Sequence, residues 1–267
     1  MSRIVERFSR LRRHKNKALI PFITAGHPHP LLTVPIMHSL VKNGASIIEL
    51  GMPFSDPMAD GIVIQDSSEK AINQGMTLSS VLDIVGEFRE KDVETPVVLM
   101  GYLNPIEKFG YQDFVETAAK SGVDAVLIVD SPPEESAELL ILLKKYNMNQ
   151  IFLIAPTTDK QRQMYILSQA SGFVYCVALK GVTGAANVEY DDLFEKINSI
   201  TAISDIPVAI GFGVKDVASA LTVAEYGDAV VIGSALVGLL DKCVNQHEVE
   251  NAIRMFIRPI AEAINKS

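Results

Sequence analysis

Apolar runs alternate with stretches of helical periodicity along the whole chain. Most of these runs are almost continuous in valine, isoleucine and leucine, which is typical of strands that are covered on both faces. The pattern predicts a strand at each run and, after it, a segment that can form a helix. The predicted strands are residues 18–24, 47–51, 96–102, 125–130, 150–155, 173–177, 207–212 and 229–233.

Helix signals occur in the segments between the runs. Residues 31–41 are apolar at helical spacing. Two prolines followed by two glutamates at residues 132–135 predict the start of another helix, because both residue types favour a first turn. Similar helical segments lie at residues 111–120, 214–225 and 248–265.

The start of the chain is basic but does not resemble a targeting peptide. Ile4, Phe8 and Leu11 fall at helical spacing within residues 1–17, and no apolar signal core follows them. We therefore expect a short helix that covers one end of the fold.

Alternation of strand and helix, repeated eight times, favours a closed barrel over an open doubly wound sheet. No glycine-rich dinucleotide fingerprint follows the first run, and no linker or shift in composition divides the chain. The length of 267 residues is close to the ~250 typical of such a barrel. The prediction is an α/β protein: a single (β/α)8 TIM barrel domain over residues 1–267, with a short N-terminal helix.

Composition narrows the choice of partners and compartment. A net charge of −8 argues against non-specific nucleic-acid binding, because no basic surplus exists to neutralise a phosphate backbone. Cys176 and Cys243 have neither metal-site nor disulfide spacing, which suits a reducing compartment. The longest apolar stretch, residues 229–240, is too short to span a bilayer. We expect a cytoplasmic protein that contacts neither nucleic acid nor membrane.

The predicted second strand carries a carboxylate. Because a strand alternates its faces, Ile47, Glu49 and Gly51 share one side and Ile48 and Leu50 the other. Two large aliphatic residues suit the helix-facing side, so Glu49 is expected in the barrel mouth. Loss of hydration there raises the pKa of a carboxyl group toward the range useful for proton transfer. The alternative is a structural ion pair inside the barrel.

The loop after this strand carries a second candidate acid, Asp60. It is either a turn residue before Gly61 or a cap for a helix that starts near Ile62. Two carboxylates on one strand-loop unit at the catalytic end also suit an acid/base or cation-stabilising pair.

Glycines follow the last three predicted strands, at Gly181 and Gly184, at Gly213, and at Gly233 before Ser234. Backbone N–H groups at such positions can approach an anion closely, and barrels bind phosphate after strands seven and eight. The sequence therefore predicts a phosphate site at this end.

Other candidates are weaker. His27 and His29 have no nearby cysteine or acid, so a metal site is not expected. Cys176 lies in an apolar run and is expected to be a packed core thiol. Its neighbour Tyr175 points the opposite way and is either a core residue or a hydroxyl in the mouth.

Residues 49–61, ELGMPFSDPMADG, closely resemble the tryptophan synthase alpha subunit. The resemblance spans nearly the whole chain and includes PFITAG at 21–26, MGYLNP at 100–105, GVTG at 181–184 and GFG at 211–213. It implies a carbon–carbon lyase that cleaves indole-3-glycerol phosphate to indole and glyceraldehyde 3-phosphate in tryptophan biosynthesis. This retro-aldol reaction needs no cofactor in the chain.

The resemblance also implies roles for single residues. Glu49 would transfer protons, Asp60 would stabilise the positive charge that develops on the indole nitrogen, and Tyr175 would lie in the mouth. Thr183 would close over the substrate near Asp60. The indole pocket would be walled by Phe22, Met100, Leu127 and Phe212, and the phosphate held by Gly184, Gly213, Gly233 and Ser234.

A partner is implied as well: a beta subunit that carries pyridoxal phosphate, receives the indole and forms an allosteric α2β2 heterotetramer. The docking surface would include Pro53, Phe54, Asp56, Asn104 and Pro132. Met52, Met58, Tyr102 and Pro133 lie on the same loops, and methionine and aromatic residues are enriched at interfaces. The alternative is that these residues only pack over the barrel mouth.

Two other functions are weighed. A phosphate-binding isomerase or ring-closing synthase would be expected to place a lysine on a catalytic strand, and no predicted strand has one in its interior. A non-enzymatic regulatory subunit would be expected to lack Glu49 or Asp60. Departures from the commonest family pattern occur at Ile62, at Ser131 and at residues 178–180, and none removes a catalytic group.

Overall fold

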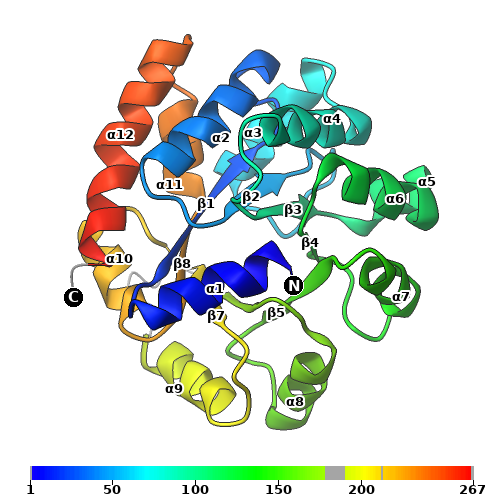
Figure 1. Ribbon diagram of the computed structural model, residues 1–267, viewed down its shortest axis with the longest axis vertical. Helices are drawn as coiled ribbons and strands as arrows, with labels where there is room; N and C mark the ends of the chain where they lie inside the picture. The colour runs from blue at the N-terminus through cyan, green and yellow to red at the C-terminus, as the bar shows by residue number, and fades with distance from the viewer. Residues whose placement is uncertain (1, 178–189, 212, 266–267) are drawn as a thin grey trace.

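The computed structural model describes residues 2–177, 190–211 and 213–265. In this part of the chain, eight parallel strands pair in sequence order, and the last pairs with the first to close a barrel (Figure 1). The strands are β1 (Ala18–Thr24), β2 (Ile48–Gly51), β3 (Val97–Gly101), β4 (Ala125–Ile128), β5 (Asn149–Ile154), β6 (Val174–Val177), β7 (Val208–Gly211) and β8 (Ala229–Ile232). The predicted (β/α)8 barrel is confirmed.

Helices surround the barrel. Before β1 lies α1 (Arg3–Arg13); η1 (Pro30–Leu32) and α2 (Thr33–Lys42) precede β2; α3 (Ile62–Asn73) and α4 (Leu78–Arg89) precede β3; α5 (Leu103–Phe109) and α6 (Tyr111–Ser121) precede β4. The remaining helices are α7 (Ala137–Lys145), α8 (Lys160–Gln169), α9 (Tyr190–Thr201), α10 (Val217–Ala224), α11 (Ser234–Leu240) and α12 (Gln246–Ala263). Within the described residues, no helix is long and apolar enough to cross a membrane.

One predicted helix start is wrong. The helix does not begin at residue 132 but at Ala137. The Glu135 amide bonds to the Pro132 carbonyl at 3.0 Å, and the Ser136 hydroxyl donates to the same carbonyl at 2.9 Å. These bonds close a turn at residues 132–136, so the two prolines belong to this turn and not to the helix.

Alternation along the strands creates two apolar layers. Ile48 and Leu50 belong to the layer between the barrel and its helices, whereas Ile47 belongs to the layer inside the barrel. Glu49 therefore faces inward, as the sequence predicts. From α1, Ile4 and Phe8 join the inner layer, so that this helix closes the end of the barrel opposite the catalytic loops (Figure 1).

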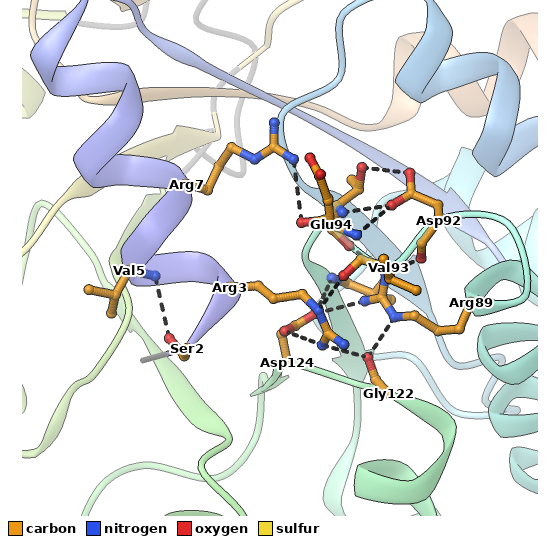
Figure 2. Close-up of polar contacts among 12 residues, drawn as sticks. Ser2, Arg3, Val5, Arg7, Arg89, Asp92, Val93, Glu94, Gly122 and Asp124 are labelled. Carbon is orange, nitrogen blue, oxygen red and sulfur yellow. Dashed lines mark hydrogen bonds and ion pairs between the residues drawn. The ribbon is translucent and has the colours of Figure 1, made fainter.

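A buried ionic network fixes α1 to the barrel (Figure 2). The Asp124 carboxylate, 4% exposed, accepts hydrogen bonds from Arg3 at 2.9 Å, from Arg89 at 2.8 Å and from the Val97 amide at 2.9 Å. The Arg89 side chain is only 10% exposed, so its positive charge depends on the Asp124 carboxylate for compensation. A charge that loses its partner in such a place is poorly compensated.

We expect Asp124→Asn to lower the free energy of unfolding by about 3–5 kcal/mol, because two arginines would lose a buried counter-ion. Urea unfolding of both proteins measures the difference. Glu134→Gln is the control: it breaks the exposed ion pair with Arg162 and should leave the midpoint almost unchanged. Equal shifts of the urea midpoint in the two variants would contradict a stabilising role for the buried Asp124 network.

Candidate active site

Glu49 lies on β2 and is almost completely buried, with 2% of its side chain exposed. Its neighbours in register are Phe22 on β1 and Val98 on β3. Among the described residues, neither carboxyl oxygen of Glu49 has a hydrogen-bond partner. The structural ion pair that the sequence leaves open is therefore not formed with any described residue.

Burial, and to a smaller degree the nearby Asp60, raises the pKa of Glu49 to about 8. A carboxyl group in an apolar setting is easier to keep neutral than ionised. At neutral pH Glu49 therefore carries its proton and is an acid that can donate it.

Asp60 stands at the end of the loop between β2 and α3. Burial raises its pKa, and a hydrogen bond from the Tyr102 hydroxyl to Oδ2, at 3.1 Å, opposes that rise. The cap of α3 is Gly61, with no side-chain hydrogen bond, so Asp60 does not serve as the helix cap. Its carboxylate is directed into the site instead.

Tyr175 lies on β6 and packs against the inner layer, while its neighbour Cys176 packs in the outer layer. Burial raises the pKa of Tyr175 well above its ordinary value, and the charges of Glu49 and Asp60 add to the effect. A Cβ on Gly211 of β7 would lie 2.1 Å from the Tyr175 hydroxyl oxygen, so the ring crosses the strand where β7 has no side chain. The three predicted catalytic residues thus lie in one site.

A small pocket, lined mainly by apolar side chains and here called the apolar pocket, opens beside Asp60. Phe22 and Met100, both predicted as walls of the pocket, line it. A Cβ on Gly51 would lie 2.6 Å from the Phe22 ring, so the ring can occupy this position only because residue 51 has no side chain. The full lining is Phe22, Gly51, Met52, Phe54, Pro57, Asp60, Ile64, Ser68, Met100, Gly101 and Tyr102.

Some predicted substrate residues lie elsewhere or outside the described part. Leu127 is fully buried in the inner layer and does not line this pocket, so its contact with substrate stays a prediction. Thr183, Gly184 and Phe212 lie outside the described residues, as do residues 178–180.

The predicted phosphate residues follow β7 and β8. Gly213 has φ +50, a backbone conformation that favours glycine. Gly233 precedes Ser234, the first residue of α11. A Cβ on Gly233 would find Phe22 at 3.8 Å and Ile64 at 3.9 Å. Because both residues line the pocket, the glycine end and the apolar pocket adjoin each other.

The predicted docking residues divide into two groups. Asp56 and Asn104 are exposed, Met58 is 84% exposed, and Pro53, Phe54 and Pro132 are half-buried. Met52 and Tyr102, in contrast, are buried, at 6% and 3% exposed, and so is Pro133. The burial of these residues suits the alternative, that they pack at the barrel mouth, and a docking role stays a prediction.

Tyr102 and Ile64 are site residues that the sequence does not assign to the pocket. The signal available for Tyr102 is its place directly after β3, at the catalytic ends of the strands. Among the described residues, no group of three or more His, Cys, Asp or Glu side chains is placed to hold a metal ion. His27 instead bonds through Nε2 to Asp241 at 2.9 Å.

The raised pKa of Glu49 predicts a pH-dependent stability. Between its ordinary value of 4.5 and about 8, the unfolded chain releases this proton while the folded chain keeps it. Stability is therefore lost as the pH rises through this window, by on the order of 5 kcal/mol in full. We expect Glu49→Gln to gain stability relative to the parent chain between pH 5 and pH 8.5, measured by urea unfolding. A difference in unfolding free energy that stays constant between pH 5 and pH 8.5 would contradict the raised pKa of Glu49.

The profile of the tryptophan synthase alpha chain family matches residues 8–265. The chain belongs to this family. The tryptophan synthase alpha chain of Nitrosococcus oceani is 50% identical over 266 residues, which are 99% of this chain and 98% of that protein. That of Thioalkalivibrio sulfidiphilus is 54% identical over 237 residues, 89% of each.

Solved structures of the family agree in fold. Tryptophan synthase subunit alpha from Legionella pneumophila superposes with a TM-score of 0.92 at 38% identity and covers 100% of both chains. A chain of the aminoacrylate-bound tryptophan synthase from M. tuberculosis gives 0.88 at 30% identity, covering 99% of this chain and 100% of its own. The resemblance to the tryptophan synthase alpha chain family is confirmed, and the roles of single residues stay predictions.

Proposed function

We propose that this chain is the lyase that cleaves indole-3-glycerol phosphate to indole and glyceraldehyde 3-phosphate in tryptophan biosynthesis. Membership of the tryptophan synthase alpha chain family supports this activity. The observation that carries it is the buried Glu49 carboxyl, which has no partner among the described residues and a pKa of about 8. It lies close enough to Asp60, which lines the apolar pocket, for the charge of Asp60 to raise that pKa. This arrangement suits proton transfer to a bound aromatic ring.

The reaction begins with a proton. Indole leaves poorly as a carbanion, so its C3 is first protonated by Glu49 to give an indolenine with positive charge on the nitrogen. The Asp60 carboxylate stabilises that charge as it develops. Such stabilisation in a water-excluded site is commonly the largest contribution to catalysis.

Bond cleavage follows. The electron pair of the bond between C3 and the glycerol carbon returns to the ring and restores indole, while the hydroxyl on that carbon becomes the aldehyde of glyceraldehyde 3-phosphate. The hydroxyl proton passes to the Glu49 carboxylate, which restores the acid. The chain thus ends the cycle in its starting protonation state, and no cofactor is needed in this sequence of steps.

The phosphate of the substrate is assigned to the end of the pocket next to Gly213, Gly233 and Ser234, together with Gly184. Support comes from the adjacency of Gly233 to Phe22 and Ile64 in the pocket wall. Barrels commonly hold phosphate after strands seven and eight, on backbone amides. With the phosphate there, the indole lies in the apolar part of the pocket.

The partner is a tryptophan synthase beta subunit that carries pyridoxal phosphate and takes up the indole, in an α2β2 assembly. Support comes from the apolar side chains at the mouth: Met58 and Ile62 are 84% and 76% exposed. Exposed methionine and aliphatic residues beside a catalytic mouth are typical of a surface that becomes covered.

A ring-closing synthase or isomerase has less support. None of the eight described strands contains a lysine. A regulatory subunit without activity also has less support, because Glu49 and Asp60 are both present and share one site.

The test is incubation of purified chain with indole-3-glycerol phosphate, alone and with a tryptophan synthase beta subunit, while indole is measured. We expect slow cleavage by the chain alone and faster cleavage with the partner. Absence of indole under both conditions would refute the lyase. Cleavage that the beta subunit leaves unchanged would refute the partner but not the activity.

A further inference from the structure

The hydroxyl of Tyr102 bridges two positions of the loop between β2 and α3. It accepts a hydrogen bond from the Ala59 amide at 2.9 Å and donates one to Asp60 Oδ2 at 3.1 Å. Tyr102 is 3% exposed, whereas its two partners lie nearer the surface, Ala59 being exposed and Asp60 half-buried. One buried hydroxyl therefore fixes both the backbone and the carboxylate at the end of the loop.

Tyr102 is itself held by the barrel. The amide of the next residue, Leu103, donates to Asp130 Oδ1 at 2.8 Å, which joins the end of β3 to the segment after β4. The Phe54 ring packs on the Tyr102 ring at 5.2 Å between centroids. Phe54 belongs to the loop between β2 and α3, so the ring contact and both hydrogen bonds of the hydroxyl join that loop to the end of β3.

The hydrogen bond engages only one oxygen of Asp60. Among the described residues, no hydrogen bond to Oδ1 is formed, and Asp60 lines the apolar pocket. Among the residues that the structure describes, the titratable groups around this carboxylate are Glu49 of β2, Tyr102 after β3 and Tyr175 of β6, with Asp130 acting on Tyr102. None of these is a cation, so within the described part of the chain the Tyr102 hydroxyl is the group that favours the ionised carboxylate.

Resting on the lyase function above, we propose that Tyr102 is a positioning residue: its hydroxyl holds Asp60 ionised and leaves Oδ1 for the indole nitrogen. Tyr102 takes no proton from the substrate and acts only through Asp60. Its contribution appears when charge develops on the indole nitrogen, because a displaced or protonated Asp60 stabilises that charge less well.

Tyr102→Phe tests the inference, because the change keeps the ring and its packing on Phe54 and removes only the hydroxyl. We expect kcat for indole release to fall about ten- to a hundredfold, as for loss of a hydrogen bond to a charged group. The KM should change little. The acid limb of the pH profile of kcat should move to higher pH, because Asp60 would be harder to ionise.

Two controls separate positioning from general structure. Tyr146→Phe removes a hydroxyl that donates to the Glu116 carboxylate at 3.0 Å on the outer helices, and it should behave as the parent chain. In a chain that already carries Asp60→Asn, Tyr102→Phe should cause little further loss. Parent kcat and an unmoved acid limb in Tyr102→Phe would overturn the inference, as would an undiminished loss in the double variant.

A measurement without substrate tests the inference independently of the proposed activity. Titration of the Asp60 carboxyl by ¹³C NMR should give a higher pKa in Tyr102→Phe than in the parent chain. If the parent chain makes no indole, the lyase function fails and this titration alone decides the positioning of Asp60. An unchanged titration would overturn the inference even in an active enzyme.

Discussion

Glu49→Gln is expected to lower the kcat of indole release by about 10²–10⁴-fold, the usual contribution of a side chain that transfers a proton. The amide has nearly the shape of the acid but cannot donate to C3 or accept from the hydroxyl. Both proton transfers of the proposed cycle depend on this one group. Indole formation by purified proteins, followed from initial rates at saturating substrate, measures the loss.

Binding should survive this substitution. The phosphate is assigned to the end of the pocket near Gly213 and Gly233, which Glu49 does not contact in the proposed arrangement. Isothermal titration with glyceraldehyde 3-phosphate should therefore give similar affinities for variant and parent chain. A variant that keeps more than a tenth of the parent kcat would exclude Glu49 as the acid, whereas loss of binding would indicate a misfolded site.

The pH profile gives a second check on the same residue. Because the proposed acid must carry its proton before the reaction, activity of the parent chain should fall as the pH rises through about 8, the pKa to which burial raises Glu49. Any residual activity of Glu49→Gln should lack this limb. The same shift costs stability over the same window, so one buried group sets both the basic limit of activity and a loss of stability.

Much of the fold is predictable from the sequence because parallel barrel strands are buried on both faces. The run at residues 18–24 coincides with β1, and the inward direction of Glu49 follows from the two-residue period of β2. Local signals fail where a turn and a helix share the same residue types. The two prolines at 132 and 133 suit a first helical turn, but the Ser136 hydroxyl bonds back to the Pro132 carbonyl and closes a turn instead.

The sequence predicts which residues form the site better than it predicts the contacts between them. The position of Glu49 on the inward face of β2 can be predicted from the sequence, but its pKa depends on which groups surround it after folding. The bond from Tyr102 to Asp60 joins residues 42 positions apart, across two loops, and no periodicity reports such a contact. From its residue type, Tyr102 is predicted on the docking surface for the beta subunit. Its burial in the structure instead indicates that it packs at the barrel mouth.

Asp60→Asn is expected to reduce kcat about 10²–10³-fold, the usual loss when one group that stabilises developing charge is removed. The indole ring of the substrate is neutral when the substrate binds, and positive charge on its nitrogen arises only after protonation of C3. An asparagine still offers an oxygen to the N–H group but no negative charge. The loss should therefore fall on kcat, with KM nearly unchanged, in steady-state assays of indole formation.

The pH profile distinguishes this role from a structural one. The parent chain needs Asp60 ionised, and burial raises its pKa, so activity should decline as the pH falls through that raised value. Asp60→Asn should lack this acid limb and keep the basic limb that belongs to Glu49. Asp66→Asn, an exposed acid on α3, serves as the matched control and should retain both limbs and the parent kcat. If Asp60→Asn instead raised KM with kcat intact, the carboxylate would bind the ground state, and the cation would need stabilisation from elsewhere in the site.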